Sequence, residues 1–149
     1  MKTGPAATPI AVFDGIATKK PLDIAATVFT SLFLLMFAVY SARGLFAPEL
    51  TSVRFFGLPT VDVDGTLYYR VYLARNLAIV IVGLVFLLRQ QWQPLAVLTT
   101  ASIALPVFDA AILYTVLGNE TPLAGHLSAF TVISIASVLL WRRVRNTGP

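Results

Sequence analysis

The sequence predicts an all-α fold: an integral membrane four-helix bundle with both termini on the cytoplasmic side and a longer first extramembrane loop. Three observations support this class. Hydrophobic residues make up 57% of the chain and charged residues 12%, whereas a soluble domain has about 45–50% apolar and roughly 25% charged residues. The mean hydropathy is +0.80. Four apolar stretches each approach the ~20 residues that a helix needs to cross a bilayer.

The chain divides into a tail, a bundle and a second tail. Residues 1–20 are predicted to form a cytoplasmic N-terminal tail with a short interfacial helix around residues 10–16. A basic cytoplasmic tail is predicted over residues 143–149. The bundle occupies residues 21–142, and its four membrane-spanning helices are expected at about 21–43, 66–89, 94–117 and 122–141.

Local signals mark where the spans begin and how they connect. The first, third and fourth spans are expected to begin at Pro21, Pro94 and Pro122, because proline fits the first helical turn, where its missing N–H would have no partner. Residues 64–66 offer capping groups for the second span. The connections after the second and third spans are short, which makes neighbouring helices antiparallel. The first connection, over residues 43–66, is longer, and such a loop is usually functional or forms a lid.

Lysine and arginine are unequally distributed between the two sides of the predicted bundle. The side with both termini and the second loop carries seven of them, and the opposite loops carry two. Because basic loops are retained in the cytoplasm, we expect a multi-pass protein of the cell inner membrane with both termini cytoplasmic. The seven are Lys2, Lys19, Lys20, Arg89, Arg142, Arg143 and Arg145, and the two are Arg43 and Arg54.

The composition excludes several kinds of chemistry. The chain has no cysteine and one histidine, His126, so a single chain has no thiolate metal site, iron–sulfur cluster or bis-histidine haem. With one carboxylate and one histidine in the spans, no metal site is predicted, and no cofactor is assigned. The net charge of +4 comes from basic residues beside apolar spans, so no nucleic-acid partner is expected.

Three ionisable residues fall in the outer half of three different predicted spans: Arg75, Asp109 and His126. At about 1.5 Å per residue, Arg75 and Asp109 reach similar depths. An arginine or aspartate costs about 2.5–3.5 kcal/mol at the centre of a membrane helix. The sequence therefore predicts an Arg75–Asp109 ion pair, which either lines an outward-facing polar cavity or only fixes the register of the helices.

Helical spacing groups further polar residues with these three. Pro106 is expected to bend the third span, because it cannot donate a hydrogen bond to the carbonyl of Ser102. An aromatic belt at the membrane surface is an alternative role for the tyrosines. At about 100° per residue, one side of the second span carries Tyr68, Tyr72, Arg75 and Asn76, and one stripe of the third carries Ser102, Pro106 and Asp109.

These residues predict an intramembrane pocket for an amphipathic ligand such as a quinone, an isoprenoid or a lipid, in a binding or accessory subunit. A second hypothesis is a membrane-embedded isomerase, cyclase or hydrolase, with Asp109 and His126 as catalytic acid and base. A third is a structural subunit of a larger membrane complex, and a homo-oligomer is also left open. The ligand-binding candidates are Arg75, Asn76, Tyr72, Tyr68 and Ser102.

A set of short motifs accompanies these residues. They are Arg-Gly-Leu-Phe-Ala-Pro-Glu at 43–49, Phe-Gly-Leu-Pro at 56–59, and Tyr-Leu-Ala-Arg-Asn-Leu at 72–77 with Gly83, followed by Asp109 and His126. Over roughly residues 22–142 the chain resembles the DoxX-like small four-helix membrane proteins, including their uncharacterised bacterial and fungal relatives. The resemblance implies a four-helix bundle. Some DoxX members are subunits of a thiosulfate:quinone oxidoreductase, and others have no assigned activity. Close relatives often carry Arg-Asp where this chain has Arg75-Asn76, so a carboxylate is missing here.

Overall fold

The computed structural model describes residues 21–59 and 62–146, and the part of the chain so described contains helices and no strand. The predicted N-terminal tail with its helix around residues 10–16 and the end of the C-terminal tail at 147–149 lie outside the described residues. The elements in chain order are α1 (Pro21–Phe46), α2 (Pro48–Phe56), α3 (Val63–Leu88), α4 (Trp92–Ser102), α5 (Ala104–Leu117), the 3-10 helix η1 (Gly118–Glu120) and α6 (Leu123–Asn146).

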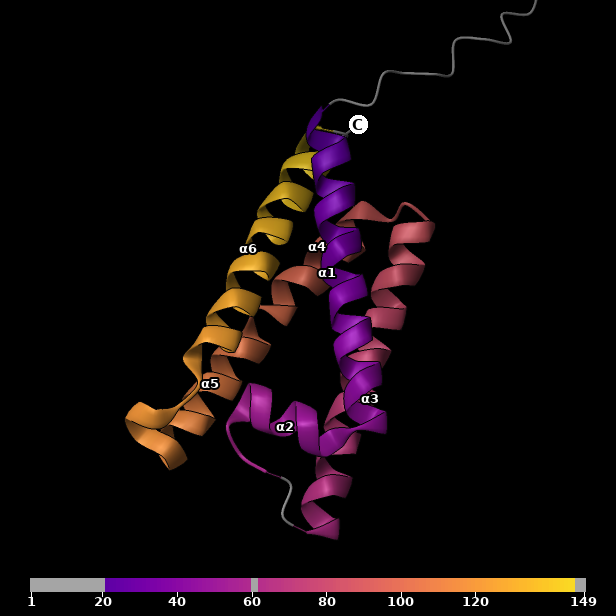
Figure 1. Ribbon diagram of the computed structural model, residues 1–149. Helices are drawn as coiled ribbons and strands as arrows, with labels where there is room; N and C mark the ends of the chain where they lie inside the picture. The colour runs from indigo at the N-terminus through magenta and orange to yellow at the C-terminus, as the bar shows by residue number, and fades with distance from the viewer. Residues whose placement is uncertain (1–20, 60–61, 147–149) are drawn as a thin grey trace, which may run out of the picture.

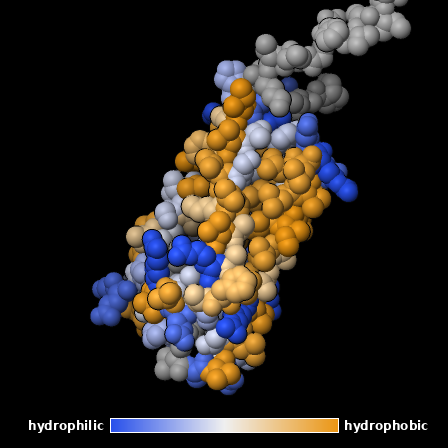
Figure 2. Space-filling model, turned by 45° about the vertical axis from the view of Figure 1, so that its right-hand side comes forward, coloured by the Kyte–Doolittle hydropathy of each residue, from blue (hydrophilic) through white to orange (hydrophobic). Residues whose placement is uncertain are grey.

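Within residues 21–59 and 62–146, four helical segments are long and apolar enough to cross a membrane, which confirms the predicted all-α four-helix class. They are α1, α3, the stretch Trp92–Glu120 and α6. Large hydrophobic side chains such as Leu35, Phe108 and Ile112 are more than half exposed on their outer faces. Hydrophobic residues cover the middle of the face seen in Figure 2, and hydrophilic residues gather toward its two ends. This is the surface of a multi-pass membrane protein.

The helices converge at one end of the molecule and separate at the other (Figure 1). We call the end where α1 begins and α6 finishes the terminal end, and the opposite end, crossed by α2, the α2 end. Helix α1 packs against α3 and α6, and α4 packs against α6 and α3. Two small apolar clusters form the core, one around Phe33, Leu34 and Ile133 and one around Leu95 and Leu140.

The first connection contains a short helix, α2, where the sequence predicted a long loop. Pro48 stands at its start, where proline is favoured. Gly57 ends it with a left-handed φ of 68°, which glycine adopts at little cost. A Cβ on Gly57 would lie 3.3 Å from the ring of Pro122, so the end of α2 lies against the start of α6. Helix α2 therefore crosses from α1 to α6 at the α2 end.

The third span is broken into α4 and α5 at Ile103. Pro106 has no N–H to donate to the carbonyl of Ser102. Just before it, Ile103 N donates to Thr100 O at 3.2 Å, a bond between residues three apart in place of the α-helical four. The bend expected from Pro106 is thus present as a break one turn earlier. As a consequence α5 follows α6 toward the α2 end, away from α1 and α3 (Figure 1).

One detail of the second span differs from the sequence prediction. Asp62, and not residues 64–66, caps the helix, because its carboxylate accepts a hydrogen bond of 2.6 Å from Gly65 N. Helix α3 therefore begins at Val63, one turn earlier than expected. Likewise α6 continues to Asn146, so the predicted C-terminal tail begins within a helix.

The terminal end is held together by one arginine. Arg143 of α6 donates to the carbonyl of Asp23 at 2.9 Å and to the hydroxyl of Thr27 at 2.7 Å, both on α1. Its Nε lies 3.7 Å from the carboxylate of Asp23, and its guanidinium carbon lies 3.4 Å from the ring centre of Trp92 on α4. Three of the four spans therefore meet at this side chain.

Candidate functional site

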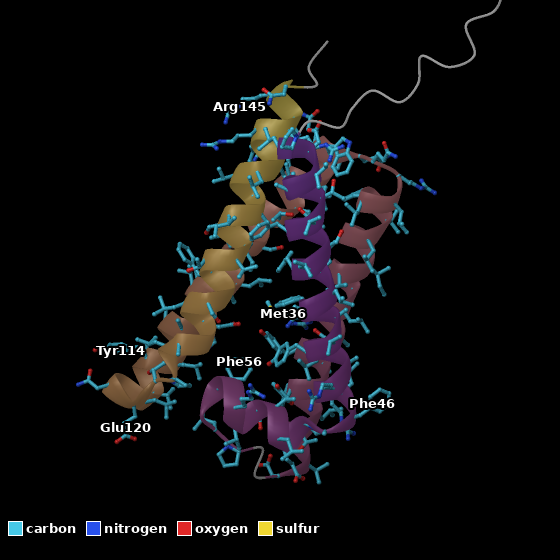
Figure 3. The ribbon with its side chains drawn as sticks, turned by 45° about the horizontal axis from the view of Figure 1, so that its top comes forward. Met36, Phe46, Phe56, Tyr114, Glu120 and Arg145 are labelled. Atoms are coloured by element: carbon cyan, nitrogen blue, oxygen red, sulfur yellow. The ribbon has the colours of Figure 1, made fainter. Side chains whose placement is uncertain are left out.

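A cavity of about 420 Å³ lies at the α2 end, between the separated helices. Its lining comes from α1, α2, α3, α5 and α6. Met36 of α1 and Phe56 of α2 both lie beside this space (Figure 3). The polar residues of the lining are Tyr40, Arg54, Tyr72, Asp109, His126 and Ser128, and the apolar ones include Met36, Phe37, Leu105, Pro106, Ala129 and Ile133.

The carboxylate of Asp109 joins α5 to α3 across this cavity. The hydroxyl of Tyr72 donates to Asp109 Oδ2 at 2.8 Å. The stripe predicted for the third span brings Asp109 to this position, since Pro106 one turn earlier also lines the cavity. A hydrogen bond to a carboxylate is stronger than one between neutral groups, so it holds the two side chains in a fixed relation.

The imidazole of His126 is the most buried polar group of the cavity lining. His126 lies in the first turn of α6 and is 8% exposed. Its Nε2 atom has no hydrogen-bond partner among the described residues. A buried polar atom without a partner costs about 1–3 kcal/mol, and most such atoms in proteins are paired with protein or water. The lining of the cavity thus includes a buried imidazole nitrogen whose hydrogen-bonding capacity is unused.

Phe56, the last residue of α2, lines the cavity and is the centre of an aromatic cluster. Its ring centre lies 5.6 Å from that of Tyr72, 5.8 Å from that of Tyr69 and 5.8 Å from that of His126. The contacts with the two tyrosines are edge-to-face, which is a favourable geometry. The hydroxyl groups of Tyr69 and Tyr40 are 3.0 Å apart, so the cluster also connects α3 to α1.

The predicted Arg75–Asp109 ion pair is wrong. Arg75 is exposed, does not line the cavity and makes no ion pair or hydrogen bond with any described residue. The reason is the rotation of α3: Leu73 is fully buried, and a residue two positions later points about 160° away from it. An arginine on an exposed face extends its long side chain toward polar surroundings.

The other ligand-binding candidates are divided between the cavity and its surroundings. Tyr72 lines the cavity, whereas Tyr68 is 77% exposed on the outer face of α3. Asn76 is 2% exposed and lies one turn from Tyr72, but it does not line the cavity. Ser102 is buried and donates to Leu98 O at 2.9 Å. It does not line the cavity either.

Several residues of the site were missed by sequence reasoning. Tyr40, Arg54 and Phe56 line the cavity, and Tyr69 packs behind it. For Phe56 a signal existed, since it precedes Gly57 in a short segment that begins with proline and ends with glycine, as helices do. No three metal-ligating side chains come together in the described part of the chain.

The comparisons with known proteins place this site within a family. A family model described as a domain of unknown function, DUF4267, matches residues 34–140. The chain belongs to the DUF4267 family. The match includes every lining residue of the cavity, from Met36 to Ile133, whereas Asp23 and Arg143 lie beyond it. No curated protein and no solved structure matches the chain, and the resemblance to the DoxX group stays a prediction.

Proposed function

We propose that this DUF4267 protein binds a small amphipathic ligand, such as a quinone, an isoprenoid or a lipid, in the cavity at the α2 end. The observation that carries the proposal is the Tyr72–Asp109 hydrogen bond in the lining of this cavity, with the buried imidazole of His126, whose Nε2 has no partner among the described residues, in the same lining. Ligand sites are mostly apolar concavities with a few polar groups that orient the ligand. The lining of this cavity has that composition.

The position of Met36 supports entry of the ligand from the surrounding lipid. Met36 lines the cavity, yet it is 53% exposed, so the lining continues onto the outer surface of α1. Arg54 and Phe56 of α2 also line the cavity, and the ring of Phe56 contacts those of Tyr72 and His126. An amphipathic molecule would place its polar group beside α2 and its chain toward Met36 and the lipid.

The orientation in the membrane and the partners belong to the same proposal. The seven-to-two distribution of lysine and arginine supports cytoplasmic termini, which makes the α2 end the outward-facing one. We place the protein in the cell inner membrane, with residues 21–142 as one bundle. It acts as a binding or accessory subunit, alone, as a homo-oligomer or in a larger membrane complex, and a distant relation to the DoxX group is part of this hypothesis.

A substitution that fills the cavity tests the proposal. We expect Ala129→Trp to occupy the cavity, because Ala129 lines it, and Ala111→Trp to leave it open, because Ala111 is exposed elsewhere on α5. The protein is purified in mild detergent, and co-purifying small molecules are identified by mass spectrometry. An amphipathic compound should accompany the wild type and Ala111→Trp, and its amount should fall about tenfold in Ala129→Trp, a loss of about 1.4 kcal/mol.

Equal amounts of the same compounds in all three proteins would contradict the proposal. A stoichiometric protein partner without any small molecule would favour the structural-subunit hypothesis instead. Protein expressed in its own cells is required, because the natural ligand must be present during purification.

A second candidate function is supported by the pairing of Asp109 and His126 in one cavity. A carboxylate and an imidazole within one site can act as base and proton shuttle. In a membrane-embedded isomerase, cyclase or hydrolase, Asp109 would remove a proton and Tyr72 would orient its carboxylate. The same extraction separates the two functions, because an enzyme leaves a converted product in the cells and a binding subunit leaves its ligand unchanged.

A further inference from the structure

We infer that the ligand of this cavity carries a neutral head group with a hydroxyl, attached to a single apolar chain. This inference rests on the proposed binding function and specifies the chemical class of the ligand. It follows from two polar groups of the lining that have hydrogen-bonding atoms without partners among the described residues, the Asp109 carboxylate at Oδ1 and the His126 imidazole, and from the size of the apolar part.

The first argument comes from the carboxylate of Asp109. Its Oδ2 atom accepts from Tyr72, whereas its Oδ1 atom accepts no hydrogen bond from any residue in the described ranges. A carboxylate oxygen accepts hydrogen bonds and donates none. A ligand group that contacts Oδ1 must therefore supply a donor. A phosphate or carboxylate head group would instead bring a second negative charge to a partly buried one, which is unfavourable.

The second argument comes from the imidazole of His126. A hydroxyl group has one donor and two acceptor lone pairs. One hydroxyl can thus donate to Asp109 Oδ1 while its oxygen accepts from the N–H of the His126 imidazole, since a neutral imidazole carries one N–H. An ammonium group has donors only, so it would satisfy the carboxylate and leave the imidazole N–H without an acceptor.

The cation of the lining does not reverse this preference. Arg54 lies on α2 and is exposed, so water screens its charge. Asp109 and His126 lie deeper among protein atoms, where charge interactions are less screened. The repulsion of an anion by Asp109 therefore outweighs its attraction to Arg54.

The size of the cavity limits the apolar part of the ligand. A volume of about 420 Å³ is near the lower end of the roughly 300–1,000 Å³ of small-molecule sites. The apolar lining from Phe37, Pro106 and Ile133 leads toward Met36. The space inside the bundle suits one chain, as in a prenyl or fatty alcohol or a hydroquinone, and the rest of that chain would leave past Met36 into the lipid.

Three probes with the same chain and different head groups test the inference. They are oleyl alcohol, oleyl phosphate and oleylamine, each titrated onto the purified full-length protein and measured by native mass spectrometry. We expect the wild type to bind oleyl alcohol about tenfold more tightly than oleyl phosphate. Asp109→Asn removes the negative charge and should reduce this ratio to about one. Asp64→Asn, an exposed position outside the cavity, should leave the ratio unchanged.

The outcomes distinguish this inference from the proposed function. Tighter binding of oleyl phosphate or oleylamine by the wild type would overturn the hydroxyl inference and leave cavity binding intact. Failure of all three probes to bind the wild type saturably would overturn the hydroxyl inference. Equal amounts of co-purified compound in the wild type and in Ala129→Trp would overturn the proposed function as well. The ranking of the probes is measured on the wild type, so the test does not depend on the folding of Asp109→Asn.

Discussion

The hydroxyl group of Tyr72 links two helices that separate at the α2 end. It donates to Asp109 at 2.8 Å, and its ring contacts Phe56. Removal of the hydroxyl alone, in Tyr72→Phe, keeps the aromatic contact and deletes the link. We expect a loss of about 1 kcal/mol in the free energy of unfolding, measured as a lower midpoint of thermal unfolding in detergent.

Tyr68→Phe is the matched control for this substitution. Tyr68 lies on the same helix, is 77% exposed and makes no hydrogen bond with a described residue, so its unfolding midpoint should equal that of the wild type. A similar decrease in both variants would show that the hydrogen bond to Asp109 contributes nothing specific.

At the scale of single residues, the sequence indicates which residues are ionisable candidates for the site better than it indicates the direction in which their side chains point. Asp109 and His126 could be selected because ionisable groups are rare in membrane helices. Arg75 was selected for the same reason and lies on the wrong side of α3. The apolar residues around it gave no help, because a membrane helix is apolar on both its buried and its lipid-facing sides. The spacing of apolar residues therefore does not reveal how α3 is rotated about its own axis.

At the scale of elements, α1 and α3 pack closely where a leucine side chain of α1 meets a glycine of α3. A Cβ added to Gly83 of α3 would lie 2.8 Å from the Cδ2 of Leu34 on α1, and Leu34 is itself buried. We expect Gly83→Leu to destabilise the protein by about 1–3 kcal/mol through overpacking, seen as a lower thermal midpoint.

Ala78→Leu adds a large side chain to the exposed side of the same helix and should have little effect. A midpoint for Gly83→Leu as high as that for Ala78→Leu would contradict tight contact between α1 and α3. Small residues at helix contacts are typical of membrane bundles, and this pair tests one contact directly.

At Pro106 the sequence predicts a bend, and the break between α4 and α5 lies one turn before this proline. The helix α2 was not predicted, because its nine residues lack the length of a span and lie between two loop signals. Its contacts with α1 and α3, rather than its own propensity, account for its stability.

At the scale of the whole molecule, the two ends are built in opposite ways. The terminal end depends on Arg143, which contacts α1 and α4 from α6. Lysine keeps the charge but has neither the planar group nor the number of donors that this position uses. We expect Arg143→Lys to lower stability by about 1–3 kcal/mol, measured by thermal unfolding, and the exposed Arg142→Lys to have no effect.

Equal midpoints for the two arginine variants would show that Arg143 is dispensable for assembly of the spans. The sequence could not distinguish these two neighbours, because both belong to a basic run of the kind that ends a membrane span. Only the tertiary arrangement selects Arg143, since Asp23 and Trp92 come from the distant α1 and α4.

The contrast between the fastened terminal end and the separated α2 end has a consequence for the surrounding bilayer. Acyl chains exert lateral pressure on a membrane protein, and this pressure acts on whichever part of the bundle can yield. At the terminal end it meets the contacts of Arg143, whereas at the α2 end it acts on helices that the Tyr72–Asp109 hydrogen bond holds across a cavity. Under the proposed function, the leaflet around the α2 end would take part in the binding equilibrium, because stiffer, more ordered chains there would oppose a bound ligand.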